Sequence, residues 1–78
     1  RLSDRISVME WIAVIFAIGM VLAAEAVNSS IEALADLVSP DYNEAIKRTK
    51  DLAAGAVLIL AIAAAIVGLL IFIPKFLN

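Results

Sequence analysis

The sequence predicts an all-α membrane protein in which two long transmembrane helices form a hairpin. Three observations predict this fold class. Of the 78 residues, 64% are hydrophobic, against roughly 45–50% in soluble domains. The mean hydropathy is +1.04, and two long apolar runs lie on either side of one short polar connection. We therefore expect residues 1–78 to form a single membrane domain.

The composition also limits the chemistry. The chain has no cysteine and no histidine, which excludes disulfides, thiol nucleophiles and imidazole ligands. Any proton transfer must use carboxylates, lysine or tyrosine. A bound metal would be held by oxygen atoms, which favours magnesium or calcium. The net charge of −2 and the absence of a basic stripe argue against a nucleic-acid partner.

The first helix is predicted over about residues 8–38. Ser7 and Glu10 form an S-x-x-E capping box, and Ile6 stands where a hydrophobic staple is expected. The apolar run from Trp11 to Ala24 is too short to cross a bilayer by itself, but the helix from residue 8 to residue 27 is about 30 Å long, which is enough. Pro40 disfavours helical geometry at the residue before it, so the helix should end there.

A connection over residues 39–42 and a second helix over about residues 43–73 are predicted next. Asp41 and Glu44 match the pattern of a second capping box. The residues from Leu52 to Ile73 form an unbroken apolar run, which strongly predicts a transmembrane helix. Pro74 is expected to end it.

A polar stripe follows the apolar part of the first helix. At about 100° per residue, four polar residues project within roughly 60° of the direction of Glu25. They are Asn28, Ser29, Glu32 and Asp36. Carboxylates near hydrocarbon depth are costly and by default mark a functional site. A two-helix hairpin cannot enclose this stripe alone, so we expect an oligomer or a further helix.

The stripe and the connection place complementary chemistry at one membrane surface. Glu25 lies about 25 Å from the helix start, near the hydrocarbon boundary, and Glu32 lies about 10 Å further out. The connection brings Lys47, Arg48, Lys50 and Asp51 to the same end. Lys47 and Arg48 are best explained as anchors to anionic lipids. Phosphoryl transfer to a lipid alcohol needs acids that bind a metal ion, a cation that binds phosphate and a base that takes the hydroxyl proton, and the remaining acids and Lys50 can supply them. No Gly-rich phosphate loop is present.

The chain from about Met9 to Pro74 closely resembles the bacterial integral-membrane diacylglycerol kinase and undecaprenol kinase family. The resemblance lies in E-A-V-N-S-S-I-E-A-L-A-D, in S-P-D-Y-N-E and in K-R-T-K-D-L-A-A-G-A-V-L-I. It implies an ATP- and Mg²⁺-dependent lipid kinase. It further implies three-helix protomers in a homotrimeric bundle, spanning the bacterial inner membrane several times, with the active site on the cytoplasmic side.

The resemblance also implies roles for individual residues. The position of Glu25 is that of the catalytic proton acceptor for the lipid hydroxyl. The position of Glu32 binds the metal and the nucleotide. Further nucleotide contacts are implied at Asp41, Tyr42, Asn43, Lys50 and Asp51, and supporting polar positions at Asn28 and Asp36.

The chain departs from the family pattern in two places. Asn43 stands where the best-known diacylglycerol kinases carry a histidine. The family also has an amphipathic segment and another membrane helix ahead of this region, which supply a second acidic metal ligand. Because the first residue is Arg1, we expect this chain to be a fragment that is inactive alone. The preferred alcohol, undecaprenol or diacylglycerol, stays open.

A two-helix transport or scaffold subunit, such as a rotor-ring hairpin, is the alternative. Such subunits also combine two membrane helices with a polar loop and a carboxylate in lipid. Their essential acid usually lies in the middle of the second helix, whereas the run from Leu52 to Ile73 contains no acid.

Overall fold

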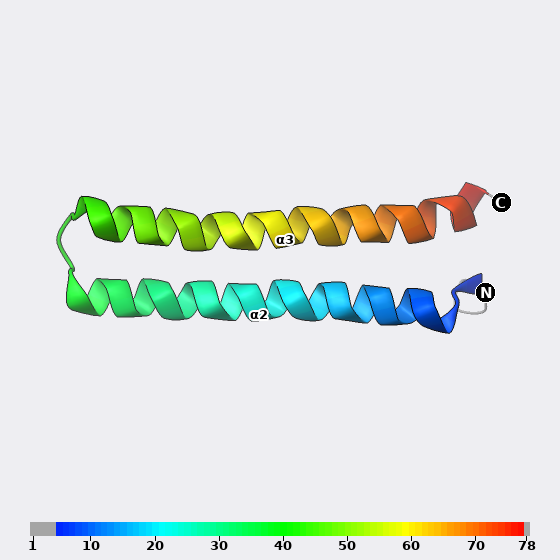
Figure 1. Cartoon of the computed structure of the whole chain (residues 1–78), viewed down its shortest axis with the longest axis horizontal. Coiled ribbons are helices and arrows are strands. Elements are labelled where there is room, and N and C mark those ends of the chain that lie inside the picture. The colour runs from blue at the N-terminus through cyan, green and yellow to red at the C-terminus, as the bar shows by residue number, and fades with distance from the viewer. Residues whose placement is uncertain (1–4, 78) are drawn as a thin grey trace.

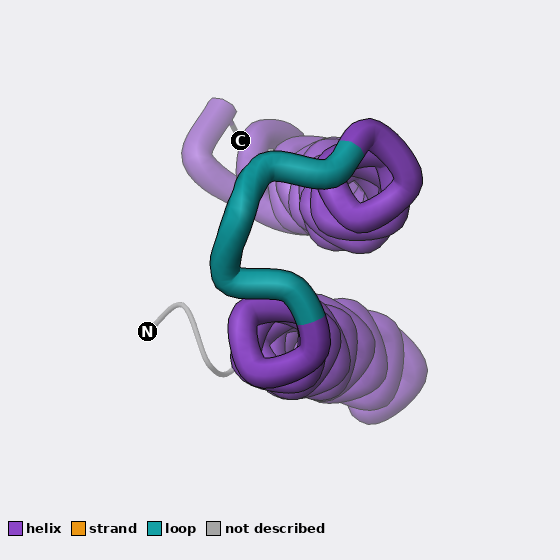
Figure 2. The backbone as a smooth tube through the Cα atoms, turned by 90° about the vertical axis from the view of Figure 1, so that its left-hand side faces the viewer, coloured by secondary structure: helices purple, strands orange, loops and turns teal. Residues whose placement is uncertain are grey.

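The computed structural model describes residues 5–77 as two antiparallel helices, α2 (Val8–Val38) and α3 (Glu44–Leu77). Figure 1 shows them side by side, with the connection at one end and the start of α2 and the end of α3 at the other. Viewed along the helices, a single loop joins the two (Figure 2). The hairpin is 54 Å long, so it extends beyond a hydrocarbon core of about 30 Å. The predicted all-α hairpin is confirmed.

The start of α2 is set by local hydrogen bonds. The backbone N–H of Glu10 donates to Oγ of Ser7 at 3.1 Å, and the N–H of Ser7 donates to Oε1 of Glu10 at 2.9 Å. Ile6, the expected staple residue, is buried. The capping box therefore forms as predicted, and α2 ends two residues before Pro40.

The start of α3 differs from the prediction, because Asn43 and not Asp41 caps the helix. Oδ1 of Asn43 accepts from the N–H groups of Ala45 and Ile46 at 2.9 and 3.3 Å. The Asn43 carbonyl accepts from the N–H of Lys47 at 2.9 Å, which is the first helical bond. A capping residue must directly precede the helix. Asp41 lies two residues too early, so the predicted Asp41–Glu44 capping box is wrong.

Asn43→Ala is expected to cost about 1 kcal/mol, because two N–H groups at the start of α3 lose their acceptor. The measurement is SDS-induced unfolding of the detergent-solubilised full-length protein, followed by circular dichroism. Asn43→Asp is the matched control, since aspartate caps as well as asparagine. An Asp variant as unstable as the Ala variant would contradict the capping role.

The end of α3 also differs from the prediction. The helix continues to Leu77 with Pro74 inside it, whereas the sequence predicted that Pro74 would end it. Proline lacks an N–H and crowds the preceding turn, which bends a helix as readily as it breaks one. The last turn lies off the line of the rest of α3 (Figure 1). There, Nζ of Lys75 donates to Oε2 of Glu10 at 2.9 Å across the hairpin.

The two helices meet along a regular seam. The least exposed positions of α2 alternate in spacings of three and four residues, and α3 carries a matching series, as in antiparallel coiled coils. On α2 these are Val14, Ala17, Val21, Ala24, Asn28, Ile31 and Ala35, and on α3 they include Ile46, Lys50, Ala53, Val57, Leu60, Ala64, Val67 and Ile71.

Most apolar side chains point away from the seam. Among the described residues only Ile6, Ala35 and Ile71 form a buried apolar core. Both helices are long and apolar enough to cross a membrane. In water this surface would be strongly unfavourable, so lipid or other helices must cover it.

Candidate functional site

The connecting end of the hairpin carries a pocket of about 340 Å³ that is lined mostly by polar residues. It is built by the end of α2, the connection and the first turns of α3. Six residues that were predicted to be in the site line it: Asp36, Asp41, Tyr42, Asn43, Lys50 and Asp51. Ser39, Pro40, Ile46 and Lys47 complete the lining. We call this the connection pocket.

Lys50, which lines this pocket, joins the two helices. Its Nζ donates to Oδ1 of Asp36 at 2.6 Å. Lys50 stands in the seam between Ile46 and Ala53, and its side chain is only 32% exposed. The apolar stem therefore packs between the helices while the ammonium group emerges beside the polar stripe. The seam position thus decides where the charge of Lys50 lies.

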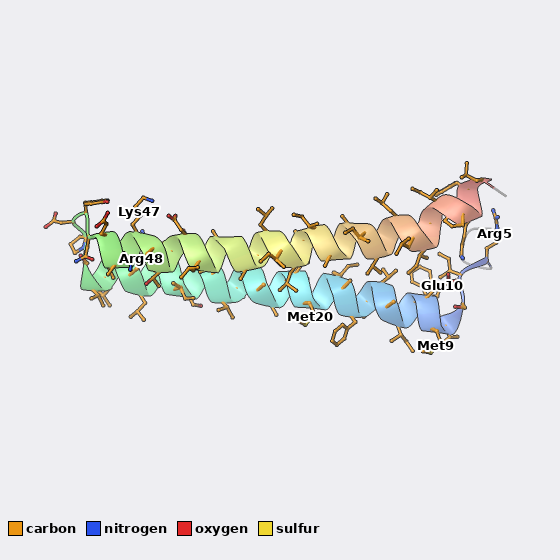
Figure 3. The ribbon with its side chains drawn as sticks, turned by 45° about the horizontal axis from the view of Figure 1, so that its top comes forward. Arg5, Met9, Glu10, Met20, Lys47 and Arg48 are labelled. Carbon is orange, nitrogen blue, oxygen red and sulfur yellow. The ribbon has the colours of Figure 1, made fainter. Side chains whose placement is uncertain are left out.

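Lys47 makes a second, local ion pair. Its Nζ donates to Oδ2 of Asp51 one turn later, at 2.9 Å, and both side chains are well exposed. Lys47 and Arg48 lie at the connecting end of the hairpin (Figure 3). Lys47 was predicted to be an anchor to anionic lipids and not a residue of the site, but it lines the pocket. The spacing of four residues between Lys47 and Asp51 could have predicted this ion pair, because residues four apart are neighbours on a helix.

The ion pairs leave the connection pocket without free positive charge. Three aspartates, Asp36, Asp41 and Asp51, line it against two lysines, Lys47 and Lys50, and each lysine already has a carboxylate partner. A polyphosphate can enter this pocket only with an accompanying cation or by displacing these carboxylates from the lysines.

The polar stripe runs along one flank of the seam. Glu25, Ser29, Glu32 and Asp36 are all exposed, whereas Asn28 is partly buried in the seam itself. Oδ1 of Asn28 is buried and has no hydrogen-bond partner within the described chain. Asn28 instead borders an apolar groove of about 310 Å³ with Ala53, Ala56 and Leu60 of α3.

The structure does not bring Glu25 into the connection pocket. Glu25 precedes Asp36 on α2 by about 16 Å of helix axis, and no ion pair involving Glu25 occurs between residues 5 and 77. Its carboxylate is exposed at the depth where the apolar part of α2 ends. The acids of the stripe therefore form a series along the helix, from the pocket toward the hydrocarbon.

Glu32 is the acid best placed to help hold a divalent cation. It lies one turn from Asp36, is exposed, and has no ion pair within the described residues. No group of three His, Cys, Asp or Glu residues converges between residues 5 and 77. Mg²⁺ is commonly held by one or two carboxylates together with phosphate oxygens and water. Glu32 fits the role of one such ligand.

Comparison with known proteins adds an independent observation. The family model described as prokaryotic diacylglycerol kinase matches residues 2–72. The chain is 40% identical to undecaprenol kinase of Bacillus subtilis over 71 residues, which cover 91% of this chain and 58% of that protein. It is 45% identical to diacylglycerol kinase of Synechocystis sp. over 60 residues, which cover 76% of this chain and 34% of that protein.

The chain therefore spans less than two thirds of the length of these curated relatives. No solved structure matches it at a significant level.

Proposed function

The chain belongs to the prokaryotic diacylglycerol kinase family, and on this premise we propose that the protein transfers the γ-phosphoryl group of ATP to a membrane lipid. The acceptor is the hydroxyl group of undecaprenol or diacylglycerol. The observation that supports this proposal most is the arrangement of charge at one end of the hairpin. A pocket with two lysines and three aspartates lies at one end of a series of acids that leads toward the hydrocarbon.

The connection pocket is the proposed site of ATP. Lys50 binds phosphate oxygens after exchanging its carboxylate partner for the nucleotide. Glu32 contributes to holding Mg²⁺, which neutralises phosphate charge when bound. Tyr42, exposed at the pocket wall, offers an aromatic face to the base. Asn43 caps α3 through its oxygen, so only its NH₂ group is left for a ligand.

Glu25 is the proposed base. Its carboxylate takes the proton of the lipid hydroxyl as the lipid oxygen bonds to the γ-phosphorus. The bond from the γ-phosphorus to the bridging oxygen breaks, and ADP leaves. A lipid alcohol carries its hydroxyl group at the boundary between headgroups and hydrocarbon, which is the depth expected for Glu25.

The proposed assembly is a homotrimer of three-helix protomers in the bacterial inner membrane, with the site on the cytoplasmic side. Two features support a larger assembly. The polar stripe is exposed on the hairpin, and among the described residues its acids do not converge into a group that could hold a metal ion. Further helices packed against this flank would cover the polar stripe and could supply additional metal ligands.

The direct test uses the complete protein in membranes with ATP labelled at the γ-phosphate. Label is expected in the organic extract when undecaprenol or diacylglycerol and Mg²⁺ are supplied, and chelation should remove it. A comparison of the two alcohols at equal mole fraction identifies the acceptor. Absence of label in both lipids would contradict the proposed function.

Glu32→Gln is expected to raise the Mg²⁺ concentration needed for half-maximal activity about tenfold or more, because even the hydrogen-bond partners of metal ligands typically contribute about 10- to 100-fold to metal affinity. The measurement is the rate of lipid labelling against Mg²⁺ at saturating ATP. Glu44→Gln, which removes an exposed acid at the same end of the hairpin, is the control and should keep the wild-type requirement. An unchanged requirement in Glu32→Gln would exclude Glu32 as a ligand.

A further inference from the structure

Lys50 lies within the influence of two carboxylates on the polar flank of α2. One is Asp36, to which Nζ of Lys50 is hydrogen-bonded at 2.6 Å. The other is Glu32, whose negative charge also acts on the Lys50 ammonium group. The two acids are one turn apart, about 6 Å along the axis. Asp51, the other acid near Lys50 in sequence, is engaged by Lys47.

We propose that Asp36 is a positioning residue that holds the ammonium group of Lys50 in the connection pocket and thereby leaves Glu32 free for a divalent cation. This inference rests on the proposed function, because it takes Glu32 as a metal ligand and Lys50 as a phosphate ligand. It concerns a residue that touches neither the acceptor nor the transferred phosphoryl group.

The seam position of Lys50 directs its charge toward α2. Its stem stands in the seam between Ile46 and Ala53, and its ammonium group meets Asp36 on the α2 stripe. An ammonium group is a compact point charge on a flexible stem and moves to the nearest available carboxylate. Without Asp36, we expect Lys50 to turn to Glu32, which lies one turn away on the same flank of α2 and whose charge already acts on the ammonium group. An ion pair there would neutralise the acid that the cation requires.

The same ion pair is poorly suited to a purely structural role. The Asp36 side chain is 67% exposed, and exposed ion pairs contribute little to stability because solvent screens them. Loss of Asp36 should therefore leave the free energy of unfolding of the hairpin nearly unchanged. Its main effect should be that Lys50 pairs with Glu32.

The test measures Mn²⁺ binding to the full-length protein in detergent without nucleotide, by the electron paramagnetic resonance signal of free Mn²⁺. Asp36→Asn is expected to weaken Mn²⁺ binding about tenfold, with the SDS unfolding midpoint nearly unchanged. Asp36→Glu, which keeps the ion pair, should retain binding, and Glu44→Gln should match the wild type.

A double variant separates positioning from direct ligation. In Asp36→Asn/Lys50→Met the competing ammonium group is gone, so Mn²⁺ binding should recover to within about threefold of the wild type. Asp36→Asn/Arg48→Met removes one exposed positive charge at the same end of the hairpin without releasing Asp51 from Lys47, and it should stay weak.

Three results would overturn the inference. They are unchanged binding in Asp36→Asn, no recovery in the double variant with Lys50→Met, and no Mn²⁺ binding by the wild type. The lipid-labelling assay on the same wild-type preparation keeps the two proposals apart. If lipid is labelled and any of these three results is found, only the role of Asp36 is rejected. If no lipid is labelled, the proposed function is rejected.

Discussion

Glu25→Gln in the full-length protein is expected to lower the rate of lipid phosphorylation by about 10²- to 10⁴-fold, the usual contribution of a positioned general base. Glutamine has the shape of glutamate and still forms hydrogen bonds, but it cannot take the proton of the lipid hydroxyl. Glu25 is exposed on the stripe and has no ion pair in the described part of the hairpin. Its carboxylate is therefore available to a substrate.

The measurement is the initial rate of label transfer at saturating Mg²⁺ and ATP, with nucleotide binding measured separately. Because Glu25 lies about 16 Å from Asp36 along α2, the affinity for ATP should change little, and the trimer should survive chemical cross-linking. Ser29→Ala, one turn further along the same flank, is the control for a general loss of polarity. A Glu25→Gln rate within a few-fold of the wild type would reject the base.

Lys50→Gln is expected to lower kcat/KM for ATP by about 10- to 100-fold. A hydrogen bond to a charged group contributes roughly 1.5–3 kcal/mol, and each 1.4 kcal/mol is a factor of ten. Most of the loss should appear in KM, because the ammonium group contacts phosphates in the ground state as well as in the transition state.

Lys47→Gln is the matched control, because it removes the same charge from the wall of the same pocket. Lys47 is held by Asp51 on its own helix and is well exposed, whereas Lys50 is fixed in the seam. We expect Lys47→Gln to change kcat/KM less than about threefold, in line with the small energy of exposed ion pairs. Equal losses in the two variants would show that the pocket responds to net charge and that the position of Lys50 is unimportant.

Local signals in the sequence were enough to predict most of the fold. The capping box of Ser7 and Glu10 and the break at Pro40 predicted both ends of α2, since each depends on neighbours within four residues. The apolar run from Leu52 to Ile73 predicted the second helix for the same reason. The cap of α3 was misplaced because Asp41 and Asn43 are both good caps, and the path of the connection selects between them.

The sequence by itself determined the two helices, the bounds of α2 and the spacing of the acids, because helical periodicity and capping are properties of consecutive residues. Only the tertiary structure decided that Asn28 enters the seam while Glu25 and Glu32 stay exposed, that Lys50 bonds to Asp36, and that α3 continues past Pro74. The physical reason for the first two is that they depend on how far one helix is rotated and shifted against the other, whereas the turn after Pro74 is joined to α2 by the Lys75–Glu10 hydrogen bond. A change of one residue in that register turns a helix face by about 100°.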